Sequence, residues 1–144
     1  MKKKPTTSVY FHSTTGNTRK VALAMAEALG VEARQVTAKG SAVEAGLLFL
    51  GGAVYGSYDH DLHPSLKAFI ASLDPSKVGR VALFKTGFET DALLRMGALL
   101  KRRGIEVETR TFACPGRFLL FMLGHPNRAD LEEAADFAKS VAGR

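Results

Sequence analysis

Short, continuously apolar runs alternate along the chain with longer segments in which apolar residues recur every three to four positions. A run of four to six mostly apolar residues is typical of a strand that is covered on both faces of a parallel sheet. Apolar residues spaced three to four apart indicate one buried face of a helix. The apolar runs predict strands at residues 8–12, 47–51 and 81–84. We expect two further strands, with more polar sequences, at residues 32–36 and 107–112.

Four segments have the periodicity of helices that bury one face. In the first, Val21, Met25 and Leu29 recur at i, i+4 and i+8, and Gly30 follows where a C′ glycine ends many helices. Pro64 suits the first turn of another helix, because its missing N–H is tolerated there. We expect helices at residues 17–29, 64–73, 90–104 and 128–141.

This alternation of strands and helices predicts an α/β fold, a three-layer sandwich built on a five-stranded parallel sheet. The 144 residues contain no linker, repeat or low-complexity segment, so we expect one domain at 1–144, with 1–6 flexible. Alternation alone leaves the order of the strands open.

Charge and cysteine content narrow the class of protein. The formal net charge is +6, yet no nucleic-acid-binding motif accompanies it, which favours an acidic protein partner or simply a solvated basic surface. One cysteine excludes an internal disulfide and fits a reducing compartment. No apolar run approaches the ~18 residues of a membrane span. We expect a cytoplasmic protein with no membrane span and no nucleic-acid partner.

The clearest chemistry lies in the turn between the first strand and the first helix, Ser13-Thr14-Thr15-Gly16-Asn17-Thr18. The N–H groups at a helix N-terminus have no partner in the helix, and the helix dipole adds positive charge there. With several hydroxyls nearby, such a turn can bind a phosphate, and Gly16 permits close backbone approach. The alternative is a turn that only caps the helix.

Other phosphate motifs do not fit this turn. The chain has no G-x-x-x-x-G-K-[ST] and no G-x-G-x-x-G after the strand, and Cys114 is too far along the chain to be the nucleophile of a phosphatase loop. The sequence S-T-T-G-N-T resembles the FMN-phosphate loop of the flavodoxin family, [ST]-x-T-G-N-T. The resemblance implies strand order 2-1-3-4-5, with FMN beyond the carboxyl ends of the strands, where the loops 13–18, 52–63 and 85–89 reach it.

The resemblance also implies roles in the other two loops. Tyr55 matches the aromatic residue that stacks on the isoalloxazine ring, with Tyr58 as a second candidate, and the Gly56 carbonyl would turn toward the ring when the ring gains a proton. Backbone N–H groups of Gly87 and Phe88 would meet the pyrimidine carbonyls. Alternatively, the tyrosines cover the sheet edge and Phe88 belongs to the core. The residues assigned to the cofactor are Ser13, Thr14, Thr15, Gly16, Asn17, Thr18, Ala53, Val54, Tyr55, Gly56, Thr86, Gly87 and Phe88.

Residues 59–63, Asp-His-Asp-Leu-His, have side chains of metal-ligand type. Adjacent ligands would be crowded and no distant Cys or His completes a shell, so we expect no metal. We interpret Asp59 and Asp61 as an acidic rim near the flavin, which His60 or His63 offsets when protonated.

The segment that follows the fifth expected strand is unusually apolar. Its F-x-C-x-G and G-H-P-x-x-x-D-L patterns resemble a subset of short flavodoxin-family proteins. Cys114 would be reactive only if its pKa were depressed, so we interpret it as a small buried residue. Residues 118–123 would form a lid packed on the sheet, a partner or dimer surface, or a wall beside the flavin.

No pair of Asp, Glu or His side chains has the spacing of a general acid–base site, so we assign no catalytic residue. We expect an FMN-binding, flavodoxin-like electron-transfer protein that works with redox partner proteins. Two alternatives stay open: an FMN-dependent reductase or oxidase acting on a small molecule, and a binding module of the same fold that has lost FMN.

Overall fold

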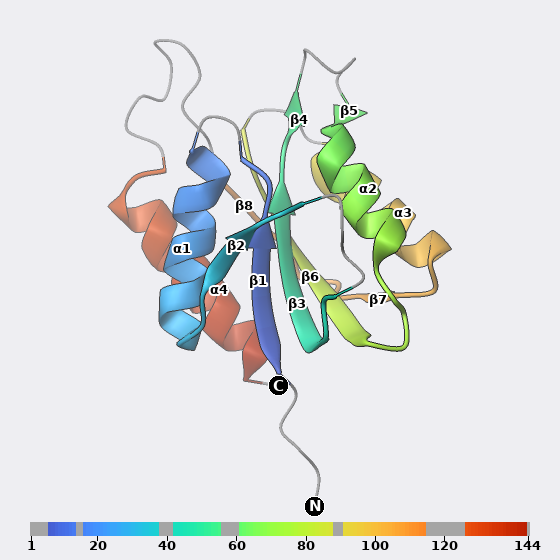
Figure 1. Cartoon of the computed structure of the whole chain (residues 1–144). Coiled ribbons are helices and arrows are strands. Elements are labelled where there is room, and N and C mark those ends of the chain that lie inside the picture. Colours follow the sequence, from blue (N-terminus) through green and yellow to red (C-terminus); the bar gives the residue numbers. More distant parts are fainter. Residues whose placement is uncertain are drawn as a thin grey trace, which may run out of the picture.

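The computed structural model describes residues 6–13, 16–37, 42–55, 61–87, 91–114 and 126–143. A parallel sheet forms its centre, in the order β2-β1-β3-β6-β7, and β8 also pairs with β6 (Figure 1). Every pairing within this sheet is parallel. The strands are β1 (Thr7–Phe11), β2 (Ala33–Gln35), β3 (Ala45–Gly52), β6 (Val78–Thr86), β7 (Glu106–Val107) and β8 (Phe112–Cys114).

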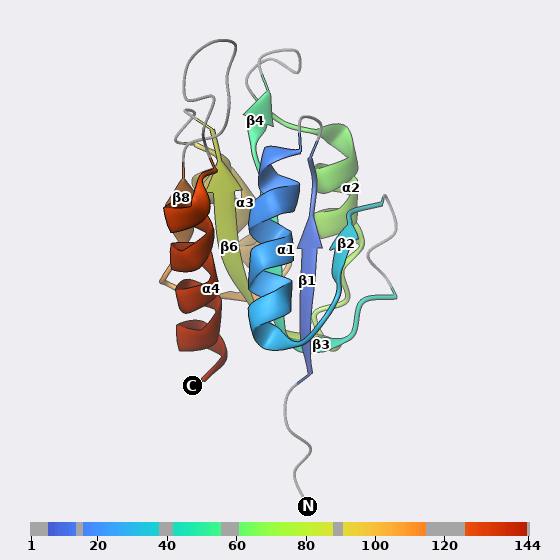
Figure 2. The ribbon, with the colours of Figure 1, turned by 90° about the vertical axis from the view of Figure 1, so that its left-hand side faces the viewer.

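Helices cover both faces of this sheet. α1 and α4 lie side by side on one face, and α2 and α3 cover the other (Figures 1 and 2). The helices are α1 (Asn17–Leu29), α2 (Pro64–Ser72), α3 (Ala92–Arg102) and α4 (Arg128–Ala142). The three-layer α/β/α fold and the strand order 2-1-3-4-5 are thereby confirmed.

Alternation along the central strands divides the core into two clusters. In β3, Leu47 and Phe49 belong to the cluster under α1 and α4, whereas Leu48 and Leu50 belong to the cluster under α2 and α3. Successive side chains of a strand point to opposite faces. Both faces of β3 are thus buried, which explains its continuously apolar sequence.

Local sequence determines where the helices begin and end. Gly30 adopts a left-handed conformation with φ 70° after α1, as its position predicted. Asn127 and Asp130 form a capping box at the start of α4, in which each side chain accepts a hydrogen bond from the other residue's backbone N–H at 2.8 Å. Pro64 is the first residue of α2.

Two details differ from the sequence-based expectation. The fifth strand position is shared by β7 and β8, and residues 108–111 between them are not assigned to a strand. The Glu108 carboxylate there contacts Arg80 of β6 and Arg110. In addition, the expected loop 52–63 contains a small antiparallel sheet, formed by β4 (Val54–Tyr55) and β5 (Asp61–Leu62).

Candidate functional site

The turn before α1 lies at the carboxyl end of β1. The N–H of Gly16 donates to Ser13 Oγ over 2.9 Å, and Gly16 has a φ of 94°, in the left-handed region. A Cβ added to Gly16 would meet nothing within 4 Å, so there is open space in front of the turn. Gly16 is also the N-cap and provides no side-chain cap for α1. Thr14 and Thr15 fall outside the described residues.

A buried hydrogen bond joins this turn to the end of β6. The hydroxyls of Thr18 and Thr86 are 2.7 Å apart, and both residues are buried. A hydroxyl that accepts one hydrogen bond still has a proton to donate. The structure thus brings together two of the three predicted loops, and Asn17, also buried, lies beside them in the first turn of α1.

The loop after β3 starts at the same edge. The N–H of His12 donates to the carbonyl of Gly51 over 2.9 Å, which ties the end of β1 to the end of β3. Ala53 follows, and the backbone of Val54 and Tyr55 forms β4 (Figure 1). Gly56 and Tyr58 fall outside the described residues, as do Asp59 and His60.

The end of β6 and the loop after it contain one residue that was predicted to bind the cofactor, Gly87, and one that was not, Lys85. Gly87 has a φ of 97°, and its N–H donates to the Cys114 carbonyl over 3.2 Å. Its own carbonyl accepts a 3.1 Å hydrogen bond from Lys85 Nζ. Lys85 is only 8% exposed and was not predicted as a site residue, although a lysine directly after the apolar run 81–84 is a usable signal. Phe88 falls outside the described residues.

Two histidines stack on each other, one directly after β1 and one directly before α2. The rings of His12 and His63 have centroids 4.1 Å apart and an interplanar angle of 25°. Burial, with a smaller contribution from His63, lowers the pKa of His12 to about 4. His63 caps α2, because its Nδ1 accepts from the Ser65 N–H over 3.0 Å. This capping role was not predicted, since sequence analysis placed His63 beside the acidic rim; its position directly before Pro64 is the signal that could have indicated the cap.

The acidic rim expected at residues 59–63 is wrong for Asp61. Its carboxylate lies 2.9 Å from Lys67 Nζ and 3.1 Å from Arg95, so its charge is balanced by two cations. The hydrogen bond from Lys67 is the main reason that the pKa of Asp61 lies below its usual value. Within the described part of the chain, no three His, Cys, Asp or Glu side chains are grouped as metal ligands.

Cys114 ends β8 and is a buried residue, as its sequence context suggested. Burial raises the pKa of its thiol to about 12, with a further contribution from Asp130. The thiol is therefore protonated at neutral pH. The apolar residues 118–123 that follow it in sequence fall outside the described residues.

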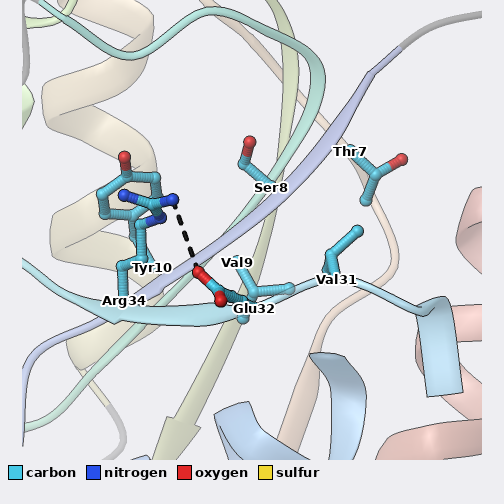
Figure 3. A pocket seen from close by; sticks show the side chains of 7 residues that line it. All are labelled: Thr7, Ser8, Val9, Tyr10, Val31, Glu32 and Arg34. Atoms are coloured by element: carbon cyan, nitrogen blue, oxygen red, sulfur yellow. Dashed lines mark hydrogen bonds and ion pairs between the residues drawn. The ribbon is translucent and has the colours of Figure 1, made fainter. Parts of the chain in front are cut away.

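A separate hollow of about 170 Å³ lies at the β1–β2 edge (Figure 3). Glu32 and Arg34 form an ion pair there at 3.5 Å. The hollow is lined by Thr7, Ser8, Val9, Tyr10, Val31, Glu32 and Arg34. None of these belongs to the three loops, so the hollow is distinct from the predicted cofactor site. None of the described helices combines the length and the apolar character needed to cross a bilayer.

Comparison with known proteins shows which solved structures have a similar fold. No family model matches the chain, and no curated protein does. Among solved structures, oxidised flavodoxin 2 from Bacillus cereus is 20% identical with a TM-score of 0.74, covering 96% of this chain and 98% of that one. A flavodoxin from the domain Archaea is 17% identical with a TM-score of 0.66, covering 96% of each chain.

The same fold also occurs within a larger protein. Rubredoxin oxygen:oxidoreductase from Desulfovibrio gigas is 15% identical with a TM-score of 0.64, and the match covers 96% of this chain and 35% of that one. The protein thus has the flavodoxin fold over nearly its whole length, which confirms the resemblance read from residues 13–18 at the level of the fold.

Proposed function

We propose that this protein binds FMN at the carboxyl edge of its sheet and carries electrons between partner proteins. In doubly wound sheets, ligands bind where the strand order reverses, which here is between β1 and β3. The turn after β1, the loop after β3 and the loop after β6 all start at this edge. The bound flavin supplies one- and two-electron redox chemistry.

The observation that carries the proposal is the hydrogen bond between Thr18 and Thr86. It holds the turn that would receive the phosphate against the loop that would border the ring. The dipole of α1 and the N–H groups of its first turn suit a phosphate. Ser13 accepts from Gly16 and keeps its own hydroxyl proton for a phosphate oxygen.

The other residues would orient the ring. Tyr55 would provide aromatic stacking, which contributes about 0.5–1.5 kcal/mol beyond area burial. Gly87, with its positive φ, would bring backbone close to the ring edge. Lys85 would place a buried cation next to this loop, where positive charge favours uptake of electrons by the ring.

A pair of glycines on the same helix allows a matched test. Gly16 and Gly30 flank α1, both have positive φ, and an added Cβ at either would meet nothing within 4 Å. Both Gly→Ala changes should cost about 1 kcal/mol in backbone strain. Only Gly16→Ala should lower the affinity for FMN, because its methyl group would occupy the space where the phosphate is proposed to bind.

Comparison of FMN with riboflavin locates the phosphate. We expect the wild-type protein to bind FMN much more tightly than riboflavin in a flavin-fluorescence titration, and Gly16→Ala to reduce that ratio. Gly30→Ala should leave the ratio unchanged. Equal effects of the two changes would refute the assigned phosphate position, and a protein that ignores both flavins would refute the cofactor. Steady turnover of NAD(P)H or a quinone by the holoprotein would indicate an enzyme instead of a carrier.

A further inference from the structure

The small β4–β5 sheet carries one of the proposed ring contacts. Tyr55 of β4 pairs with Asp61 of β5, and Val54 pairs with Leu62. β4 continues from the top of β3, and β5 lies above α2 (Figure 1). Each strand has only two residues, and two-stranded sheets are marginal in water without further contacts. Additional contacts must therefore fix the backbone of Tyr55.

Asp61 provides such contacts from one carboxylate. Its Oδ2 accepts from Lys67 Nζ on α2 over 2.9 Å, and its Oδ1 accepts from Arg95 on α3 over 3.1 Å. Oδ1 also accepts from the N–H of Leu62 over 2.7 Å, and Leu62 is completely buried. One side chain thus joins β5 to both helices of the α2/α3 face.

We propose that Asp61 is a positioning residue that holds Tyr55 in place for the flavin ring by anchoring the β4–β5 sheet to α2 and α3. This inference rests on the proposed function, because it assigns a purpose to the Tyr55 position. The register supplies the link, since Asp61 lies directly across from Tyr55. Asp61 acts through Lys67 and Arg95 and needs no contact with the flavin.

Neighbouring charges define which variants are informative. Asp91 also pairs with Arg95, at 3.9 Å, and Arg102 lines the same hollow of about 220 Å³ as Asp61, Lys67 and Arg95. Arg95 can therefore still pair with Asp91 when Asp61 is replaced by asparagine. Replacing Arg95 removes the contact with α3 and leaves the contact of Asp61 with Lys67 on α2.

Asp74 provides a matched control for Asp61. Both carboxyl groups have a pKa below the usual value, caused first by a side-chain hydrogen bond. The hydrogen bonds of the Asp74 carboxylate are local, with its Oδ1 accepting from the N–H and hydroxyl of Ser76 at 2.9 and 2.7 Å. Asp74→Asn should therefore change charge and local structure without affecting the β4–β5 sheet.

The first experiment works without flavin. The chain contains no tryptophan, so Tyr55→Trp creates a single indole reporter in β4. We expect Asp61→Asn in this background to raise acrylamide quenching of the indole fluorescence and to lower its anisotropy, whereas Asp74→Asn leaves both unchanged. Circular dichroism verifies that each variant is folded, and Arg95→Gln should change the reporter in the same direction but by less, because Asp61 keeps its contact with Lys67. Identical reporter signals in all variants would overturn the inference.

The second experiment measures FMN affinity in the chain with Tyr55 intact. Exposed ion pairs are individually weak, so we expect Asp61→Asn to raise the dissociation constant of FMN only about fivefold. The Asp61→Asn/Arg95→Gln double variant should bind FMN about as weakly as Asp61→Asn alone, since Asp61→Asn already breaks the contact with Arg95. Arg95→Lys should retain part of the affinity. Additive losses would overturn the inference. If the wild-type protein binds no FMN, the proposed function fails, while the indole reporter still decides whether Asp61 anchors the sheet.

Discussion

The two faces of the sheet differ in chemistry at the carboxyl edge. On the α1/α4 face, the buried polar groups include the neutral hydroxyls of Thr18 and Thr86 and the protonated thiol of Cys114, while the Asp130 carboxylate lies at the start of α4. On the α2/α3 face, they are titratable or charged, with His12 stacked on His63 and Asp61 paired with two cations. The hydrogen bond between the two hydroxyls on the first face should not depend on pH near neutrality. The second can change its charge as protons are gained or lost.

The largest expected difference between the faces concerns adjacent glycines of β3. A Cβ on Gly51 would lie 2.1 Å from the buried ring of Phe84 on the α1/α4 face. A Cβ on Gly52 would lie 2.6 Å from the end of the Leu66 side chain on the other face. We expect Gly51→Ala to lower the free energy of unfolding by more than about 3 kcal/mol and Gly52→Ala by about 1–2 kcal/mol.

Urea unfolding of both variants measures this difference. The physical reason is that the fully buried ring of Phe84 is rigid and closely packed, whereas a leucine methyl group can rotate away. If Gly52→Ala proved the more damaging change, the α2/α3 face would be the more rigid of the two.

The second prediction concerns pH and the α2/α3 face. The pKa of His12 is about 4 in the folded protein and 6.5 in the unfolded chain, so the unfolded chain takes up its proton first as pH falls. Stability should therefore decrease between about pH 6.5 and pH 4, by on the order of 3 kcal/mol from this group. His12→Gln should flatten the profile over that range. Urea unfolding at several pH values tests this, and parallel profiles for the two proteins would contradict it.

A smaller and pH-independent effect is expected on the α1/α4 face. Thr18→Val keeps the shape of the side chain but leaves the buried Thr86 hydroxyl without its 2.7 Å partner. We expect a loss of about 1–2 kcal/mol, partly recovered in the Thr18→Val/Thr86→Val double variant, because no buried hydroxyl then lacks this partner. The loss should be the same at pH 7 and pH 5 in urea unfolding. A loss that grows on acidification would remove the contrast between the faces.

The smallest effect concerns the thiol of Cys114. Because its pKa is raised to about 12 and the residue is only 6% exposed, iodoacetamide should label it very slowly at pH 8 in the folded protein. Labelling in urea should be complete within the same time, as mass spectrometry would show. Rapid labelling of the folded protein would show that this face opens locally.

Much of the architecture could be predicted because it depends on local patterns. The helix at 17–29, its end at Gly30 and the start of α2 at Pro64 all agree with the structure. β6 extends beyond the predicted 81–84, from Val78 to Thr86, because its ends still pair with β3 and β8 along the backbone. Hydrophobicity marks where a strand is buried and does not mark where its pairing stops.

The features that could not be predicted depend on partners far apart in sequence. Asp61 was interpreted as part of an acidic rim because its partner Arg95 lies 34 residues away in sequence, on α3, and the pairing is not visible in the local sequence. The His12–His63 stack likewise needs two loops that only the folded sheet brings together. The division of the fifth strand into β7 and β8 accompanies ion pairs of Glu108 with Arg80 and Arg110, which residue-by-residue propensity does not encode.

The Thr18–Thr86 contact also has a consequence for assembly. Its two residues are 68 positions apart, in α1 and at the end of β6, so neither half of the chain can form it alone. A chain cut in the turn between α2 and β6 would yield one fragment with the phosphate turn and another with the β6 end. Complementation of the two fragments should restore the folded circular-dichroism spectrum and, under the function proposed above, the binding of added FMN.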